Sequence, residues 1–176
     1  MKARTRDACV RCGWVSLTLL LILFATGAGR PKPAATLLNR AAPEFSRRDL
    51  NGQRVDLAGL RGNVVLLNFW ATWCAPCEAE IPIFSKWQQK YAASGLRIIG
   101  ISMDDGDLPA RKMVARLKPD YPIVMGDAKL GRRYGGVLGL PLTLLIDRKG
   151  IVRAQFQGVV DLQAMERRMQ QMLRTP

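Results

Sequence analysis

The chain of 176 residues has the length of one domain, and its 48% hydrophobic and 23% charged residues are typical of a globular protein. This composition excludes a disordered or fibrous chain, and four cysteines are too few for a disulfide-rich scaffold. The absence of histidine excludes catalytic groups and metal sites that require an imidazole.

The beginning of the chain has the pattern of an export signal. Basic residues at positions 2, 4, 6 and 11 are followed by an uncharged run of 18 residues from Cys12 to Gly29. Such a run behind a basic start predicts either a cleaved signal peptide or a short membrane anchor. We therefore assign residues 1–33 to this segment with a short linker, and residues 34–176 to one folded domain. The domain is expected to be exported to the periplasm or another extracytoplasmic space.

The formal net charge of +13 is spread along the chain. Residues 1–32 contribute +5, and the basic residues beyond them form no stripe interleaved with aromatic residues. No nucleic-acid partner is therefore expected. The spread indicates a solvated basic surface that faces anionic lipid headgroups or an acidic partner.

Predicted strands and helices alternate along the rest of the chain. Asn51-Gly52 between two short runs indicates a hairpin of residues 45–49 and 53–57. Apolar runs then predict strands at residues 64–70, 97–102, 121–125, 142–147 and 151–158. Helical spacing of apolar residues predicts helices at residues 77–94, 107–118, 128–134 and 161–174. This order predicts an α/β fold with a central mixed sheet flanked by helices and an N-terminal β-hairpin extension.

Three of the predicted helices carry more specific expectations. Pro82 lacks an N–H group and should kink the helix of residues 77–94. Asp161 is the expected N-cap of the last helix, whose apolar side carries Met165 and Met169. The helix of residues 107–118 is expected to place three apolar residues on one side: Leu108, Val114 and Leu117.

The candidate chemistry centres on Cys74 and Cys77, which are separated by Ala75 and Pro76. A Cys-x-x-Cys pair after a buried strand and before a helix is the usual context of a redox-active dithiol. Unpaired N–H groups at the helix start favour a thiolate, so Cys74 is the expected nucleophile. Cys77 should be more buried and should resolve the mixed disulfide. Pro76 suits the first helical turn, where its missing N–H costs nothing.

Three other interpretations of the cysteines compete with a redox-active pair: a zinc site, a structural disulfide and an inert buried pair. Cys9 and Cys12 would complete a four-ligand zinc site, but they precede the apolar run and would be removed or lie across the membrane. A purely structural disulfide in a four-residue loop gives little chain-entropy stabilisation. A buried, inert pair is disfavoured because Trp73 and Pro76 indicate a surface turn. No metal and no other cofactor is expected, and the role of Cys9 and Cys12 stays open.

Three motifs in order resemble the thioredoxin superfamily. The strongest is NFWATWCAPC at residues 68–77, followed by Glu80-Ile81-Pro82. The others are APEF at residues 42–45 with the hairpin after it, and GLPLTLLID at residues 139–147. Within the superfamily, the chain is similar to the TlpA/ResA-like thiol-disulfide oxidoreductases, which are exported and often membrane-tethered. The resemblance covers about residues 42–173 and implies a thioredoxin-like fold.

The resemblance also implies residues that contact a substrate. Pro141 matches the cis-proline that lies beside the redox pair in this family. Leu140, just before it, would offer backbone groups to a bound peptide in strand-like pairing. Trp73 precedes Cys74 and Pro76 lies between the two cysteines, and both are expected to contact the substrate as well.

The resemblance further implies a proton acceptor near the second cysteine. Thioredoxins commonly carry a buried aspartate at the position of Asn68, and an amide cannot accept a proton. Glu80 matches a position where this subgroup often has a carboxylate, which could take the proton from Cys77. The alternative is a solvated glutamate that the helix dipole favours.

We therefore expect a monomeric enzyme that reduces disulfide bonds of partner proteins outside the cytoplasm. The resemblance implies apocytochrome c as one substrate class. A thiol oxidoreductase of the membrane would have to restore the dithiol, because that compartment is otherwise oxidising.

Two other functions are compatible with a reactive cysteine pair in this fold. A peroxiredoxin-like thiol peroxidase would carry a Pro-x-x-x-Thr-x-x-Cys motif, but Leu67 stands at the position of the proline and Ala71 at that of the threonine. A redox-inert thiol or copper-binding module would need soft ligands, and no methionines cluster near Cys74 in the sequence.

Overall fold

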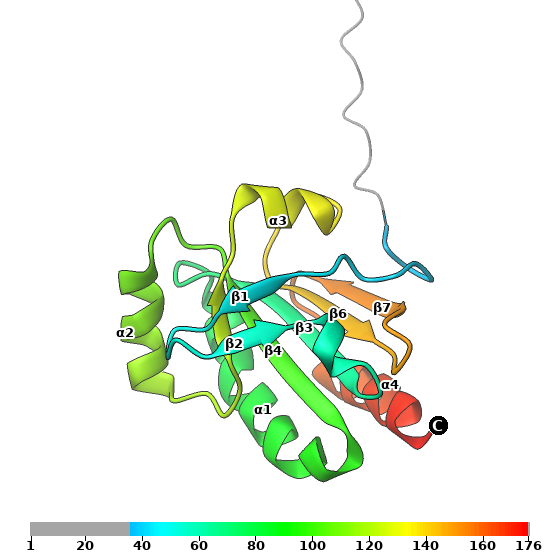
Figure 1. Ribbon diagram of the computed structural model, residues 1–176. Coiled ribbons are helices and arrows are strands. Elements are labelled where there is room, and N and C mark those ends of the chain that lie inside the picture. The colour runs from blue at the N-terminus through cyan, green and yellow to red at the C-terminus, as the bar shows by residue number, and fades with distance from the viewer. Residues whose placement is uncertain (1–35, 176) are drawn as a thin grey trace, which may run out of the picture. The chain divides into compact units, whose positions relative to one another are not determined.

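The computed structural model describes residues 36–175. The expected signal peptide or anchor at residues 1–33, together with Cys9 and Cys12, lies outside these residues. In the described part, a twisted sheet separates two layers of helices and loops (Figure 1).

The central sheet has five strands in the order β5-β4-β3-β6-β7. β3 and β4 pair in parallel, as do β4 and β5, whereas β6 is antiparallel to both β3 and β7. The predicted mixed sheet is thus confirmed. The strand bounds are Val64–Trp70 for β3, Leu96–Ser102 for β4, Ile123–Met125 for β5, Leu142–Ile146 for β6 and Val152–Gln157 for β7.

Four α-helices and two 3-10 turns lie within residues 36–175, and no helix there is long and apolar enough to cross a membrane. α1 begins two residues earlier than predicted, and it continues through Pro82, so this proline does not end the helix. A 3-10 turn follows α1 and closes on Gly95, whose φ is +92°. The bounds are Ala75–Tyr91 for α1, Asp107–Leu117 for α2, Ala128–Arg133 for α3, Leu162–Arg174 for α4, Ala58–Leu60 for η1 and Ala92–Ser94 for η2.

β3 is the centre of the molecule, and all seven of its residues are buried. Its side chains alternate between two cores, with Leu66 and Trp70 on one face and Leu67 and Phe69 on the other. The first core lies under α1, α2 and α4, and the second lies under residues 37–45, the hairpin and α3 (Figure 1). Burial on both faces explains why this strand reads as a continuous apolar run.

The predicted hairpin is confirmed as a small antiparallel sheet, with shorter strands than expected: β1, Ser46–Arg48, and β2, Arg54–Asp56. The Asp49 carboxylate closes its turn by accepting hydrogen bonds from the N–H groups of Asn51 and Gln53. The N–H group of Leu50 donates to the carbonyl of Ile123 over 2.9 Å, which ties the hairpin to the edge strand β5.

Two helices show how far helical spacing predicts burial. In α4, Asp161 caps the N-H groups of Gln163 and Ala164, and Met165 and Met169 are fully buried, as expected. In α2, the prediction for Leu108 is wrong, because this side chain is 61% exposed. The buried stripe of α2 consists of Ala110 and Met113 with Val114 and Leu117 packed beside them, and a period of 3.6 residues puts Leu108 on the opposite side.

The side-chain amide of Gln88 in α1 forms hydrogen bonds with backbone groups of β4 at a place where no strand lies beside it. β5 pairs only with the last three residues of β4, from Gly100 to Ser102. The side-chain oxygen of Gln88 accepts from the N–H of Ile98 over 2.8 Å, and its nitrogen donates to the carbonyl of Leu96 over 3.4 Å. The amide thus bonds to the strand as a backbone peptide group would.

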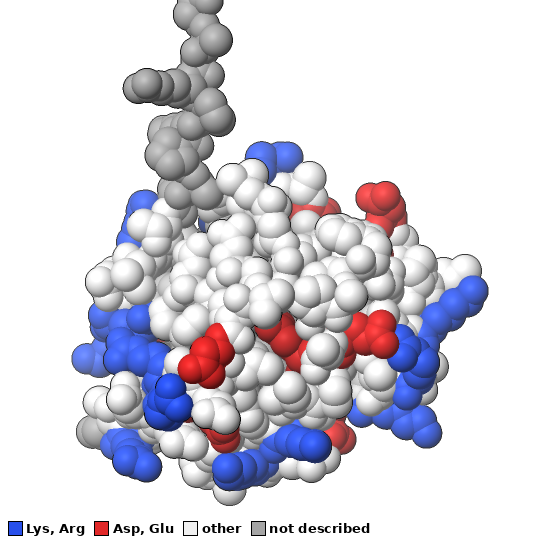
Figure 2. Space-filling view, turned by 180° about the vertical axis from the view of Figure 1, so that it is seen from behind, with Lys and Arg blue, Asp and Glu red and all other residues white. Residues whose placement is uncertain are grey.

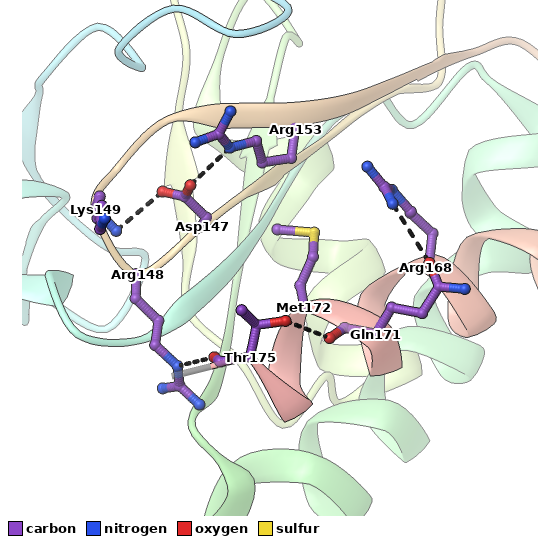
Figure 3. A pocket seen from close by; sticks show the side chains of 8 residues that line it. All are labelled: Asp147, Arg148, Lys149, Arg153, Arg168, Gln171, Met172 and Thr175. Carbon is purple, nitrogen blue, oxygen red and sulfur yellow. Dashed lines mark hydrogen bonds and ion pairs between the residues drawn. The ribbon is translucent and has the colours of Figure 1, made fainter.

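Arg148, in the turn between β6 and β7, bonds to three other parts of the domain. Its guanidinium donates to the carbonyls of Gly62, Ser94, Leu173 and Thr175. Its neighbour Asp147 stabilises the same turn, because its carboxylate accepts from the N–H groups of Lys149 and Ile151 and pairs with Arg153 at 2.7 Å (Figure 3). The turn therefore anchors the end of α4 to the rest of the fold.

Charged side chains on the described surface are partly paired between elements. Arg47 pairs with Asp127 at 2.5 Å, and Arg116 of α2 pairs with Glu78 of α1 at 2.8 Å. Figure 2 shows Lys and Arg side chains mainly toward the margins of one face, around a largely uncharged centre that a few acidic side chains cross. Exposed ion pairs such as Arg47–Asp127 and Arg116–Glu78 each contribute little to the stability of the fold.

We predict that Arg148→Met lowers the free energy of unfolding by about 1–3 kcal/mol, because four backbone carbonyls, one of them partly buried, lose a charged donor. Arg168→Met is the matched control, since Arg168 makes one exposed contact, 3.3 Å to Gln171, and should change stability by at most about 0.5 kcal/mol. Urea unfolding of the two variants measures the difference. Equal stabilities would show that the Arg148 contacts add nothing.

Candidate redox site

The redox pair lies where the central strand passes into the first helix. β3 ends at Trp70, and Cys74 is the N-cap of α1, with extended backbone angles of φ −99° and ψ 96°. Cys74 and Cys77 form a disulfide with their Cα atoms 5.3 Å apart. The N–H of Cys77 donates to the sulfur of Cys74 over 3.3 Å, so the helix terminus points a donor at this sulfur.

The two cysteines differ in burial as the sequence predicts. Cys74 is 5% exposed and Cys77 is completely buried. Pro76 is exposed in the first turn of α1, and the preceding Trp73 is 72% exposed. Trp70, by contrast, is a core residue with no exposed surface. A partner molecule can therefore reach the pair from the side of Trp73 and Cys74.

Asp104 holds the loop that leads to Cys74, a role that the sequence analysis missed. Its carboxylate accepts from the backbone N–H of Thr72 at 3.1 Å and from the Thr72 hydroxyl at 2.7 Å. Ser102, which donates to the same carboxylate at 2.8 Å, is in register with Trp70. The available signal was an acidic residue just after a buried strand that ends at the same edge of the sheet as β3.

The segment before β6 meets the carboxyl end of β3. Phe69 is in register with Leu142, so Pro141 lies beside the start of the loop to Cys74. The peptide bond between Leu140 and Pro141 is cis, as the resemblance implies. Pro141 is buried, and Leu140 packs against the core cluster that contains both cysteines. The structure thus brings this segment and the redox pair together.

Glu80 lies one helical turn after Cys77 and is only 5% exposed. The side-chain nitrogen of Asn68 donates to a carboxylate oxygen of Glu80 over 3.3 Å and to the Thr143 hydroxyl over 2.9 Å. Burial raises the pKa of Glu80 from 4.5 to about 7, against the smaller lowering effect of the Asn68 hydrogen bond. The alternative of a solvated glutamate is therefore wrong, while its role in proton transfer stays a prediction.

Comparison with known proteins agrees with this geometry. Residues 38–155 match the AhpC/TSA family. The thiol-disulfide oxidoreductase ResA of Bacillus thuringiensis is 32% identical over 149 residues, which cover 85% of this chain and 83% of that protein. The chain belongs to the ResA-like thiol-disulfide oxidoreductases. Its enzymatic class is therefore thiol-disulfide oxidoreductase, as predicted.

Solved structures confirm the thioredoxin-like fold. A protein described as the thiol:disulfide interchange protein DsbE of Chlorobium tepidum superposes with a TM-score of 0.74 and 31% identity, covering 79% of this chain and 99% of that one. A second thiol:disulfide interchange protein of this organism, from the thioredoxin family, gives a TM-score of 0.70 with 27% identity, over 82% and 99% of the two chains.

The structure also bears on the two alternative functions. Leu67 and Ala71, at the positions of the peroxidase motif, are completely buried apolar residues without a hydroxyl group. Within residues 36–175, no group of three or more Cys, Asp or Glu side chains is placed to hold a metal ion. The first observation does not favour a peroxidase.

We predict that the burial of Glu80 makes the oxidised protein less stable as the pH rises. Its folded-state pKa of about 7 exceeds the ordinary 4.5, so protonation favours the folded state below about pH 4.5, and this advantage is lost as the pH rises through about 7. Glu80→Gln should therefore gain stability relative to the wild type across this range. Urea unfolding of the oxidised proteins from pH 4 to pH 8 tests it.

Glu78→Gln provides the control for this measurement. Glu78 is in the same helix, but its hydrogen bond to Arg116 lowers its pKa. This variant should show no such gain between about pH 4.5 and 7. A pH-independent stability difference between Glu80→Gln and wild type would contradict the prediction.

Proposed function

We propose that the protein reduces disulfide bonds of partner proteins outside the cytoplasm, with Cys74 as the nucleophile and Cys77 as the resolving thiol. The main support is the arrangement of the pair: the slightly exposed Cys74 lies at the start of α1, and the fully buried Cys77 lies one turn inside the helix. The N–H of Cys77 points at the Cys74 sulfur, and this donor together with the helix dipole favours a thiolate on Cys74.

Two exchange steps complete the reduction. The Cys74 thiolate attacks one sulfur of the partner's disulfide, forming a mixed disulfide and releasing the other partner sulfur as a thiolate. The Cys77 thiolate then attacks the Cys74 sulfur, which forms the Cys74–Cys77 disulfide and releases the partner in its dithiol form. Two electrons pass from the cysteine pair to the partner, and the oxidised pair is the state in this structure.

Glu80 would accept the proton that Cys77 loses before the second step. A carboxyl group with a pKa of about 7 is substantially ionised at neutral pH and still basic enough to accept a proton from a thiol. The carboxylate becomes a carboxylic acid, and Cys77 becomes the attacking thiolate. Because Glu80 and Cys77 are three residues apart on α1, they share one side of the helix.

Exposed apolar side chains around the site support a protein substrate. Five large apolar side chains are exposed in the described part of the chain, and three of them, Trp73, Leu138 and Val159, belong to the segments next to Cys74 or Pro141. Trp73 adjoins Cys74, Leu138 is two residues before Leu140, and Val159 follows Gly158, whose N–H donates to the Pro141 carbonyl over 2.8 Å. These side chains would contact a partner segment paired with the backbone of Leu140.

The location and partners follow from the sequence and the resemblance. The basic start and the uncharged run at residues 12–29 support export with a cleaved signal or an anchor. Apocytochrome c, whose cysteines must be reduced, is the substrate class that we propose. A membrane thiol oxidoreductase would return the Cys74–Cys77 disulfide to the dithiol.

We predict that Cys74→Ser abolishes reduction of a model protein disulfide, whereas Cys77→Ser accumulates a mixed disulfide through Cys74. The first variant lacks the nucleophile, and the second cannot release the bound partner. Insulin reduction and non-reducing gels measure the two effects. The double variant Cys9→Ser/Cys12→Ser is the control that should keep wild-type activity. Full activity in both single variants would refute the proposal.

We also predict a reduction potential of the Cys74–Cys77 pair near −270 mV or below, as expected of a reductase. Equilibration with redox buffers, followed by quantification of the free thiols, gives this value. A potential near −120 mV would instead assign the protein to disulfide formation and reverse the proposed direction of electron flow.

A further inference from the structure

A row of small and polar residues crosses the sheet face beneath α1. Asn68 of β3 is in register with Gly100 of β4 on one side and with Thr143 of β6 on the other. The flanking positions on this face are core residues such as Leu66. Glu80 lies over this row, because Asn68 donates to its carboxylate. A buried polar patch therefore lies directly below the helix that carries the cysteines.

Gly100 leaves room in this patch for two aromatic side chains. A Cβ atom at Gly100 would lie 3.1 Å from the indole nitrogen of Trp70, 3.3 Å from a ring carbon of Tyr121 and 2.4 Å from the side chain of Ile123. Any larger residue would push these groups away. Gly100 thus allows the Trp70 indole and the Tyr121 ring to meet over β4.

The hydroxyl of Tyr121 is buried and has no hydrogen-bond partner in the oxidised structure. The side chain is 6% exposed, and a buried polar group of this kind ordinarily has a partner. Burial, and after it the negative charge of Glu80, raises the pKa of Tyr121. The Tyr121 ring lies against Gly100, and the register neighbour of Gly100 is Asn68, which donates to the Glu80 carboxylate. The N–H of Asp120, next to it, donates to the Ser85 hydroxyl over 3.2 Å and fastens this segment to α1.

We propose that Tyr121 is a positioning residue for Glu80, whose ionised carboxylate receives a hydrogen bond from the Tyr121 hydroxyl when the cysteines are reduced. The inference rests on the proposed function, because it gives the proton acceptor Glu80 a second donor beside Asn68. When Cys77 transfers its proton, the Glu80 carboxylate becomes a carboxylic acid and Cys77 a thiolate. Tyr121 keeps its own proton throughout and sets the pH at which Glu80 can accept one.

The groups that face Glu80 come from several elements. Cys77 lies on α1 itself, Asn68 on β3 and Tyr121 just before β5. Asn68 does not titrate, and Tyr121 stays neutral near pH 7 because its pKa is raised. The nearby acid Glu78 pairs with Arg116 of α2. The titration near neutral pH therefore belongs to Glu80 and the thiols that it serves.

The test is the pH dependence of thiol alkylation in the reduced full-length chain. Iodoacetamide reacts with thiolates, so its rate reports thiol ionisation whether or not a given partner protein is reduced. Tyr121→Phe removes a single oxygen that has no partner in the oxidised structure, so the oxidised variant should unfold as the wild type does. Loss of a donor to the carboxylate should raise the Glu80-linked midpoint by about one pH unit.

Two further variants show whether the shift passes through Glu80. Glu80→Gln removes the Glu80-linked midpoint, and adding Tyr121→Phe to it should leave the profile unchanged. Tyr91→Phe is the matched control, because its hydroxyl bonds to Glu166 near the far end of α1, and it should keep the wild-type profile. An unshifted midpoint in Tyr121→Phe overturns the inference. A change of the alkylation profile of the same size when Tyr121→Phe is added to Glu80→Gln overturns it as well. Failure of insulin reduction in the wild type would refute the proposed function instead.

Discussion

The burial of β3 on both faces is the constraint on which the redox site depends. Seven consecutive buried residues fix this strand between two cores, and hydrophobic burial of that extent leaves it little freedom. The strand ends at Trp70, so the short loop to Cys74 starts from a fixed point. Asp104 and the Pro141 segment meet the chain at the same edge. The cysteines lie outside the sheet, but these contacts with its edge fix their position.

The same burial changes the chemistry of the few polar groups inside it. Asn68 lies among apolar side chains on the central strand and donates hydrogen bonds to two side-chain acceptors. Glu80 descends from α1 to meet it, and the loss of water raises the pKa of this carboxyl. A carboxyl that is costly to ionise suits proton exchange near neutral pH. The burial that raises this pKa therefore lowers the stability of the folded protein at neutral pH, and it also brings the titration of the carboxyl to neutral pH.

The features predicted from the sequence are those that local patterns determine. The apolar run of β3, the cap at Asp161 and the hairpin around Asn51 depend on neighbouring residues, and the structure confirms each. The misses depend on distant contacts. The exposure of Leu108 follows from how α2 rotates against the core, and the bond from Asp104 to Thr72 joins residues 32 positions apart. Glu80, by contrast, was expected beside Cys77, and its burial agrees with that expectation, although the extent of burial depends on residues of three strands.

The Gln88 amide has a consequence for the protein in crowded surroundings. The first half of β4 would otherwise offer an open backbone edge, which is the template on which strands of other molecules add. With Ile98 N–H and Leu96 C=O already engaged, an incoming strand must displace the glutamine before it can pair. Gln88 thus covers a stretch of backbone edge on which a strand of another molecule could otherwise add.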